Sequence, residues 1–104
     1  MPGITAVTWS PAGASRSELP GMGATLRHIN VKAGHIATRH HHDFEQFLYV
    51  VSGHARLECE QGAIRLEPGT ALHLEAGAWH SAEFTADTVL IELNLDGATR
   101  SAAA

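Results

Sequence analysis

Half of the chain's eight histidines lie between residues 34 and 46, and three of them, His40, His41 and His42, are consecutive. Side chains alternate between the two faces of an extended strand, so we expect His40 and His42 to share one face and His41 to lie on the other. Two imidazoles on one face, followed by a carboxylate or an amide, are a suitable start for a transition-metal site. Such a site needs a further ligand from elsewhere in the chain.

Glu45 and Gln46 are the two candidates for the ligand that follows His42. Glu45 has the charge that a divalent cation favours. Gln46 has the same parity as Leu48 and Val50, which form one face of a predicted strand. We therefore favour Gln46, and expect Glu45 to point outward as a partner of the ligands.

The composition is typical of one soluble domain. The chain has 104 residues, of which 44% are hydrophobic, and a formal net charge of −4. This charge gives no reason to expect a nucleic-acid surface, and no apolar run approaches the roughly 18 residues that a membrane span needs. The N-terminus lacks the pattern of a signal peptide, and the single cysteine, Cys59, fits a reducing cytoplasm.

Glycines divide most of the chain into short segments that read as strands. Many short strands with glycine turns predict an all-β antiparallel sandwich or barrel. We expect an irregular arm over residues 1–23 with one edge strand around residues 4–9, a barrel over residues 24–95, and a tail over residues 96–104. The predicted barrel strands span residues 24–32, 46–51, 55–60, 63–66, 71–74, 81–85 and 89–93.

The segment from Phe47 to Val51 is apolar on both faces. A strand has this composition when both faces are covered. Two explanations remain open: a partner subunit covers the outer face, or a sandwich within one chain covers both.

The spacing of glycines, histidines and the glutamine resembles the two motifs of the cupin family. The first motif is matched by Gly34, His40, His42, Gln46 and Gly53. The second is matched by Gly69, Gly77 and His80, with Glu75 where the family usually has proline and Phe84 where it often has asparagine. The resemblance covers residues 24–95.

This resemblance implies a double-stranded β-helix, the jelly-roll barrel of RmlC-like proteins, and a homodimer. It also implies that His80 faces His40 and His42 across the barrel. With Gln46 these residues would hold a divalent transition metal such as zinc, nickel, iron, manganese or copper.

Five further residues are candidates for the lining of the ligand pocket. Arg27 and Arg56 are candidate clamps for an anionic ligand. His28 and His73 lie within predicted strands, and Trp79 precedes His80.

The run from His40 to Gln46 is similar to that of small cupins with three histidines and one glutamine, which include cupins that linearise unsaturated uronates. This resemblance implies a metal-dependent enzyme that isomerises or ring-opens a sugar acid or related carbonyl compound. Two alternatives remain open: a metal-dependent dioxygenase, and a non-catalytic module that binds or senses a small molecule.

Overall fold

The computed structural model describes residues 2–98, and within these residues the chain forms nine β-strands and no helix. The strands are β1 (Arg16–Pro20), β2 (Thr25–Val31), β3 (Ile36–His40), β4 (Glu45–Ser52), β5 (Ala55–Cys59), β6 (Gly62–Leu66), β7 (Ala71–Leu74), β8 (His80–Phe84) and β9 (Thr88–Leu95). No helix in this part of the chain is long and apolar enough to span a membrane.

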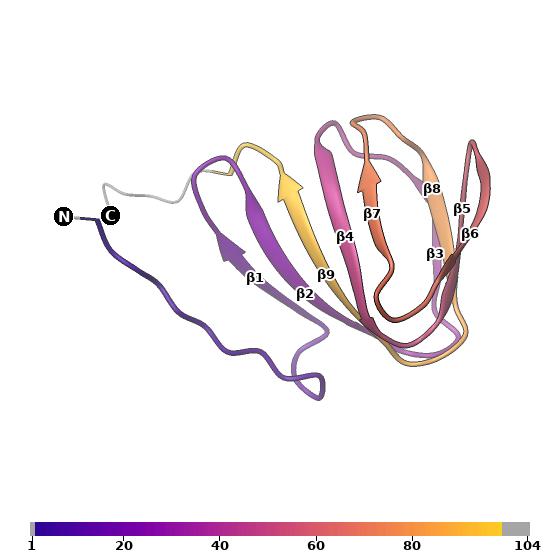
Figure 1. Cartoon of the computed structure of the whole chain (residues 1–104), viewed down its shortest axis with the longest axis horizontal. Coiled ribbons are helices and arrows are strands. Elements are labelled where there is room, and N and C mark those ends of the chain that lie inside the picture. Colours follow the sequence, from indigo (N-terminus) through magenta and orange to yellow (C-terminus); the bar gives the residue numbers. More distant parts are fainter. Residues whose placement is uncertain (1, 99–104) are drawn as a thin grey trace.

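The strands form two antiparallel sheets. A five-stranded sheet has the order β1-β2-β9-β4-β7, and a four-stranded sheet has the order β3-β8-β5-β6 (Figure 1). Strands that are adjacent in the chain often lie in different sheets, which is the arrangement of a jelly roll. The all-β prediction is therefore confirmed.

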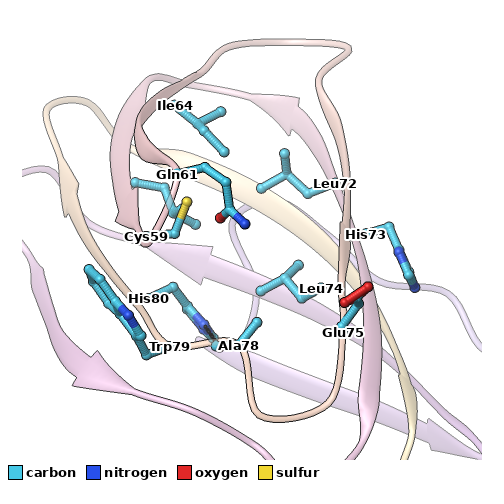
Figure 2. Close-up of a pocket in the computed structure, with 11 residues that line it drawn as sticks. Cys59, Gln61, Ile64, Leu72, His73, Leu74, Glu75, Ala78, Trp79 and His80 are labelled. Atoms are coloured by element: carbon cyan, nitrogen blue, oxygen red, sulfur yellow. Dashed lines mark hydrogen bonds between the residues drawn. The ribbon is translucent and has the colours of Figure 1, made fainter.

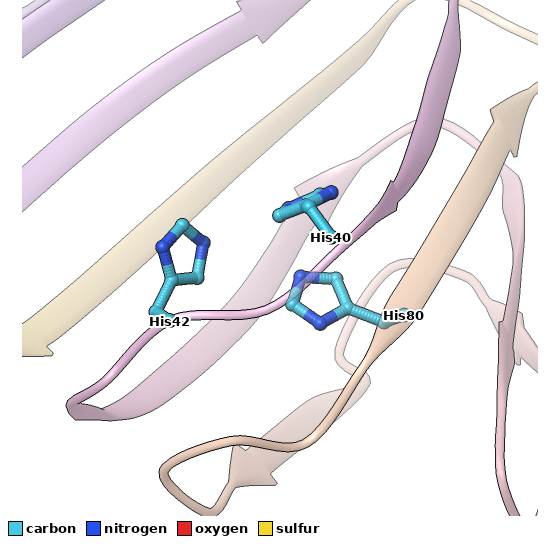
Figure 3. Close-up of side chains that lie close together, drawn as sticks. All are labelled: His40, His42 and His80. Carbon is cyan, nitrogen blue, oxygen red and sulfur yellow. The ribbon is translucent and has the colours of Figure 1, made fainter.

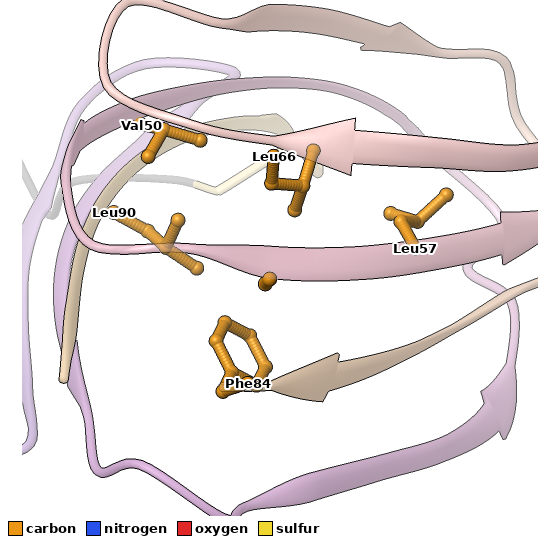
Figure 4. Close-up of a cluster of buried hydrophobic side chains, with 6 residues drawn as sticks. Val50, Leu57, Leu66, Phe84 and Leu90 are labelled. Atoms are coloured by element: carbon orange, nitrogen blue, oxygen red, sulfur yellow. The ribbon is translucent and has the colours of Figure 1, made fainter. Parts of the chain in front are cut away.

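The hydrophobic core lies between the two sheets. It consists of the buried side chains of Val50, Ala55, Leu57, Leu66, Phe84 and Leu90 (Figure 4). Val50 and Leu90 are register partners on β4 and β9, while Phe84 ends β8 in the opposite sheet. Because β8 begins with His80 and ends with Phe84, the predicted ligand and the core occupy opposite ends of the same strand.

The seven predicted barrel strands are all present, with their ends shifted by at most a few residues. Two elements differ from the prediction. Residues 36–40 form β3, which was not among the predicted strands, and the edge strand of the arm is β1 at Arg16–Pro20 rather than residues 4–9. β1 has a pairing partner in β2, which explains its position. Of the predicted tail, only residues 96–98 are described.

Gly53 shows why glycine is needed at one of the predicted turns. Its φ is +96°, a region that residues with a Cβ rarely adopt. A Cβ at this position would lie 2.3 Å from Oγ1 of Thr88 and 2.4 Å from the backbone oxygen of Asp87. The turn between β4 and β5 therefore packs directly on the start of β9.

The outer face of β4 is exposed in the single chain. Phe47, Tyr49 and Val51 are 44%, 48% and 46% exposed, whereas Gln46 and Val50 on the inner face are buried. The sandwich thus covers one face of this strand and leaves the other open.

Candidate metal centre

Three histidines converge at one end of the barrel. His40 ends β3, His80 begins β8, and His42 lies in the loop between β3 and β4. One ring nitrogen from each lies within 4.8 Å of those of the other two, and Figure 3 shows the three rings gathered around a common point. Residues far apart in the sequence are thus placed together, as the cupin resemblance implied.

A β-bulge directs His40 toward this cluster. Ala37 pairs with Ala82, but His40 pairs with His80, so β3 has one more residue than β8 between the two pairs. In a regular ladder, Arg39 would share the inward face with Ala37, which packs on the core. The extra residue changes the parity and turns His40 inward instead.

In the rings of His40 and His80, a backbone carbonyl determines which nitrogen is free to bind a metal ion. Nδ1 of His40 lies 2.7 Å from the oxygen of Thr38, and Nδ1 of His80 lies 3.1 Å from the oxygen of Ala78. A carbonyl oxygen only accepts hydrogen bonds, so each Nδ1 carries the proton. Each Nε2 therefore keeps the lone pair that a metal ion requires.

The loop that carries His42 is held by two contacts. The His42 ring stacks on Phe44 with a centroid distance of 5.0 Å. The backbone nitrogen of Gly77 donates to the carbonyl oxygen of His42 at 2.7 Å. Because Gly77 belongs to the turn that leads into His80, this bond ties the two ligand-bearing segments together.

The environment favours the neutral form of two of the histidines. Burial, followed by the neighbouring His40 and His80 and by Arg27, lowers the pKa of His42. Burial also lowers the pKa of His80, although the hydrogen bond to Ala78 acts in the opposite direction. Neutral imidazoles are the form that binds metal ions.

Gln46 is buried on the inner face of β4, and Asn94 lies beside it on β9. The Nε2 of Gln46 donates to Oδ1 of Asn94 at 2.8 Å. This bond leaves the amide oxygen of Gln46 available as an acceptor or ligand.

Glu45 lies on the opposite, outward side of β4. Its carboxylate contacts Nε2 of His73 at 2.5 Å, at a half-exposed position. This placement supports the preference for Gln46 over Glu45 as the fourth ligand.

A pocket of about 330 Å³ opens beside His80 (Figure 2). Its lining includes His80 and Trp79 at one end, and Leu57, Ile64 and Leu72 between the sheets. Trp79 also stacks under the guanidinium of Arg39, whose Cζ lies 4.0 Å from the ring centroid. The predicted pocket residue Trp79 therefore does border a cavity next to the cluster.

The other candidate pocket residues have different surroundings. Arg27 lies on the inward face of β2, two residues from Ile29, which packs on the core. His28 lies on the other face of β2 and its ring contacts Trp9. The side chain of Arg56 is 63% exposed and pairs with Glu58 on the outside of β5.

His73 borders the pocket, but its ring lies against Phe47, with a centroid distance of 4.9 Å. Figure 2 shows this ring pointing away from the residues around His80. Of the five candidates, Arg27 acts on His42 through its charge, and Trp79 borders the pocket beside His80.

Sequence reasoning missed two polar residues of the interior, Glu92 and Asn94. Both lie on the inward face of β9, where Asn94 is fully buried and Glu92 is a register partner of Arg27. The alternation of apolar and polar residues from Ile91 to Leu95 was the available signal. The polar residues alternate with leucine and isoleucine, so apolar side chains face outward and polar ones face the site.

The residues present fit a divalent transition metal. The two Nε2 lone pairs, the ring of His42 and the amide oxygen of Gln46 form a borderline donor set of the kind that holds such ions. A metal would also explain why three imidazoles lie so close together.

Comparisons with known proteins agree with this fold. The chain matches the family model described as "Cupin domain" over residues 27–95. Solved structures that are similar include KdgF from Halomonas sp., with 24% identity, a TM-score of 0.71 and coverage of 90% of this chain and 89% of that one. An RmlC-like cupin from Shewanella frigidimarina has 19% identity, a TM-score of 0.71 and coverage of 88% and 83%.

Ectoine synthase from P. lautus is similar at 18% identity and a TM-score of 0.72, over 81% of this chain and 64% of that one. At these identities the likeness concerns the fold. A comparison with curated protein sequences found no match. The family-model match, the two-sheet jelly roll and the motif spacing together show that this chain belongs to the cupin family.

Proposed function

We propose that this cupin is a metal-dependent enzyme that acts on a small anionic carbonyl compound, by isomerising it or opening its ring. The observation that carries the proposal is the convergence of His40, His42 and His80. Their proton arrangement favours metal binding, as described above. Gln46 would complete the donor set with its amide oxygen.

The choice of an amide over a carboxylate sets the charge of the centre. Three neutral histidines and a glutamate would leave a divalent ion with a net charge of about +1, whereas Gln46 keeps it at about +2. A bound ion of this charge would polarise a carbonyl or enediol oxygen and favour anionic ligands.

Arg27 supports an anionic substrate. It lies on the inward face of β2 and is close enough to the site for its charge to lower the pKa of His42. A guanidinium binds a carboxylate through two parallel hydrogen bonds. The similarity of residues 40–46 to cupins that linearise unsaturated uronates points to a sugar acid as the substrate class.

Elemental analysis of protein purified without a histidine tag tests the metal centre. We expect close to one equivalent of a transition metal in the wild type and less than about a tenth in His80→Ala. His41→Ala is the matched control, because His41 is the exposed neighbour of two ligands. Wild-type protein without transition metal would refute the proposal.

A screen of unsaturated uronates and related keto sugars then tests the reaction. Turnover by zinc-loaded protein without dioxygen would support isomerisation or ring opening and exclude the dioxygenase alternative. Turnover that survives His80→Ala would contradict a role for the site.

We also propose that the chain forms a homodimer through the outer face of β4. Phe47, Tyr49 and Val51 lie on this face, and Leu95 of β9 lies on the same side next to Glu45. An apolar row of this kind on a sheet indicates an interaction surface. Light scattering should give twice the chain mass for the wild type and the chain mass for Tyr49→Asp; a monomeric wild type at micromolar concentration would refute the dimer.

A further inference from the structure

Glu92 is a carboxyl in the barrel interior to which the proposed site gives no role. It lies on β9, between β2 and β4, with Arg27 and Leu48 as its register partners. Gln46 and Asn94 form the next inward-facing row of the same sheet. Both edges of β9 are occupied by other strands. The remaining exposure of Glu92 is therefore toward the space between the sheets, where the histidines lie.

Glu92 has no ion pair, among the described residues, that would explain it as a structural charge; the polar group beside it on β9 is the neutral amide of Asn94. Arg27 makes its ion pair with Glu18 of β1, with 3.5 Å between Nε and Oε1. Among residues 2–98, no ion pair within 4.0 Å includes Glu92. Buried carboxylates are usually paired, so an unpaired one beside a candidate site calls for a functional explanation.

The groups that face Glu92 come from several strands. Burial raises the pKa of its carboxyl, and this effect outweighs the opposing charges of Arg27 and Arg16, the amide of Asn94 and the charge of His40. The influence of His40 places Glu92 within electrostatic reach of the histidine cluster. A raised pKa brings a carboxyl closer to the operating pH, which suits a group that both accepts and returns a proton.

We propose that Glu92 is the catalytic acid and base of this cupin, facing the three-histidine site from β9 and transferring a proton within the bound substrate. The inference rests on the proposed function. It also supplies what the glutamine ligand removes, because the centre has no carboxylate ligand to act as an internal base.

The transfer balances without any other reactant. The Glu92 carboxylate takes a proton from the hydroxyl-bearing carbon next to a carbonyl group, and the electrons of the broken C–H bond form the C=C bond of an enediolate. The hydroxyl proton passes to the former carbonyl oxygen, the carboxylic acid returns its proton to the former carbonyl carbon, and the C=O bond re-forms on the neighbouring carbon. No oxidant or reductant is consumed.

Kinetics of zinc-loaded variants on an unsaturated uronate or keto sugar acid test the role directly. We expect Glu92→Gln to reduce kcat by about 100-fold to 10,000-fold while zinc content stays at the wild-type level. Glu83→Gln is the matched control, because Glu83 is an exposed carboxyl on the outward side of β8. Wild-type kcat in Glu92→Gln would overturn the inference.

Two measurements need no substrate. The first is a carbon-13 titration of Glu92, with zinc as the probe. Zinc should lower the pKa of Glu92 and leave that of Glu83 unchanged, because only Glu92 faces the site. The second is thermal unfolding at pH 7, where removal of a buried, unpaired charge in Glu92→Gln should raise Tm.

A pKa of Glu92 that does not respond to zinc would show that the carboxyl does not face the site. A fall in Tm for Glu92→Gln would assign Glu92 to structural pairing instead. A wild type that binds zinc but turns over no substrate would count against the proposed function, and the zinc titration would still decide where Glu92 faces.

Discussion

Asn94 should affect the zinc affinity of the site although it is not itself a proposed ligand, because it orients the proposed ligand Gln46. Asn94 is 0% exposed, and its Oδ1 accepts the hydrogen bond from Nε2 of Gln46 at 2.8 Å. Without this acceptor, the amide of Gln46 has no preferred orientation, and its oxygen is no longer directed away from Asn94. We therefore expect Asn94→Leu to weaken zinc binding.

The size of the effect follows from the geometry. Loss of an outer partner of a metal ligand reduces affinity by about 10-fold to 100-fold, which corresponds to about 1.4 to 2.8 kcal/mol. Asn94→Leu also leaves the buried nitrogen of Gln46 without an acceptor, at a cost of about 1 to 3 kcal/mol in the free energy of unfolding.

Asn94→Asp separates these two effects. Its carboxylate keeps an oxygen acceptor for Gln46, so zinc affinity should stay close to that of the wild type. The free energy of unfolding should still fall, because the new charge is fully buried. Calorimetric titration with zinc in a competing chelator measures the affinity, and thermal unfolding of the metal-free protein measures stability.

Two results would refute this reasoning. Zinc binding by Asn94→Leu within twofold of the wild type would mean that Gln46 is not oriented by Asn94 or is not a ligand. Equal losses of zinc affinity in Asn94→Leu and Asn94→Asp would mean that the hydrogen bond between Gln46 and Asn94 is irrelevant to zinc binding and that both variants act by disturbing the sheet.

Three further predictions concern stability. Gly53→Ala should lower the free energy of unfolding by about 3 kcal/mol or more, because its Cβ would meet backbone atoms. Gly62→Ala, which has a φ of +110° but open space around the Cβ, should lower it by only about 1 to 2 kcal/mol. Equal losses for the two variants in chemical denaturation would contradict this. Leu66→Ala should lower the free energy of unfolding by about 2 to 5 kcal/mol, because Leu66 is 1% exposed in the core. A loss below about 1 kcal/mol would show that the surrounding core collapses into the space that Leu66 leaves. The pKa values of His42 and His80 lie below the ordinary 6.5, so these two groups bind fewer protons in the native metal-free protein than in the unfolded chain. The Tm of the metal-free protein should therefore fall as pH drops below about 6.5. A Tm that rises toward acid would contradict the lowered pKa values.

The strands and turns could be predicted because their signals are local. Alternation of apolar residues marked the barrel strands. The glycines that separate the predicted strands, Gly34, Gly53, Gly62, Gly69 and Gly77, all have positive φ in the structure. β3 escaped prediction because its residues, Ile36 to His40, are mostly exposed and polar, so no apolar alternation marks them. β1 was placed too early because an edge strand is defined by the neighbour with which it pairs.

The sequence by itself offered the candidate ligands, because its resemblance to the two cupin motifs relates His40, His42, Gln46 and His80 without coordinates. Only the tertiary structure decided how they are directed. The bulge in β3 arises from pairing with β8, and its extra residue turns His40 rather than Arg39 inward. The partners Asn94 and Glu92 come from β9, which is distant from β4 in sequence and adjacent to it only in the folded sheet. The local alternation in β9 could indicate a polar face, but only the strand pairing places that face beside Gln46.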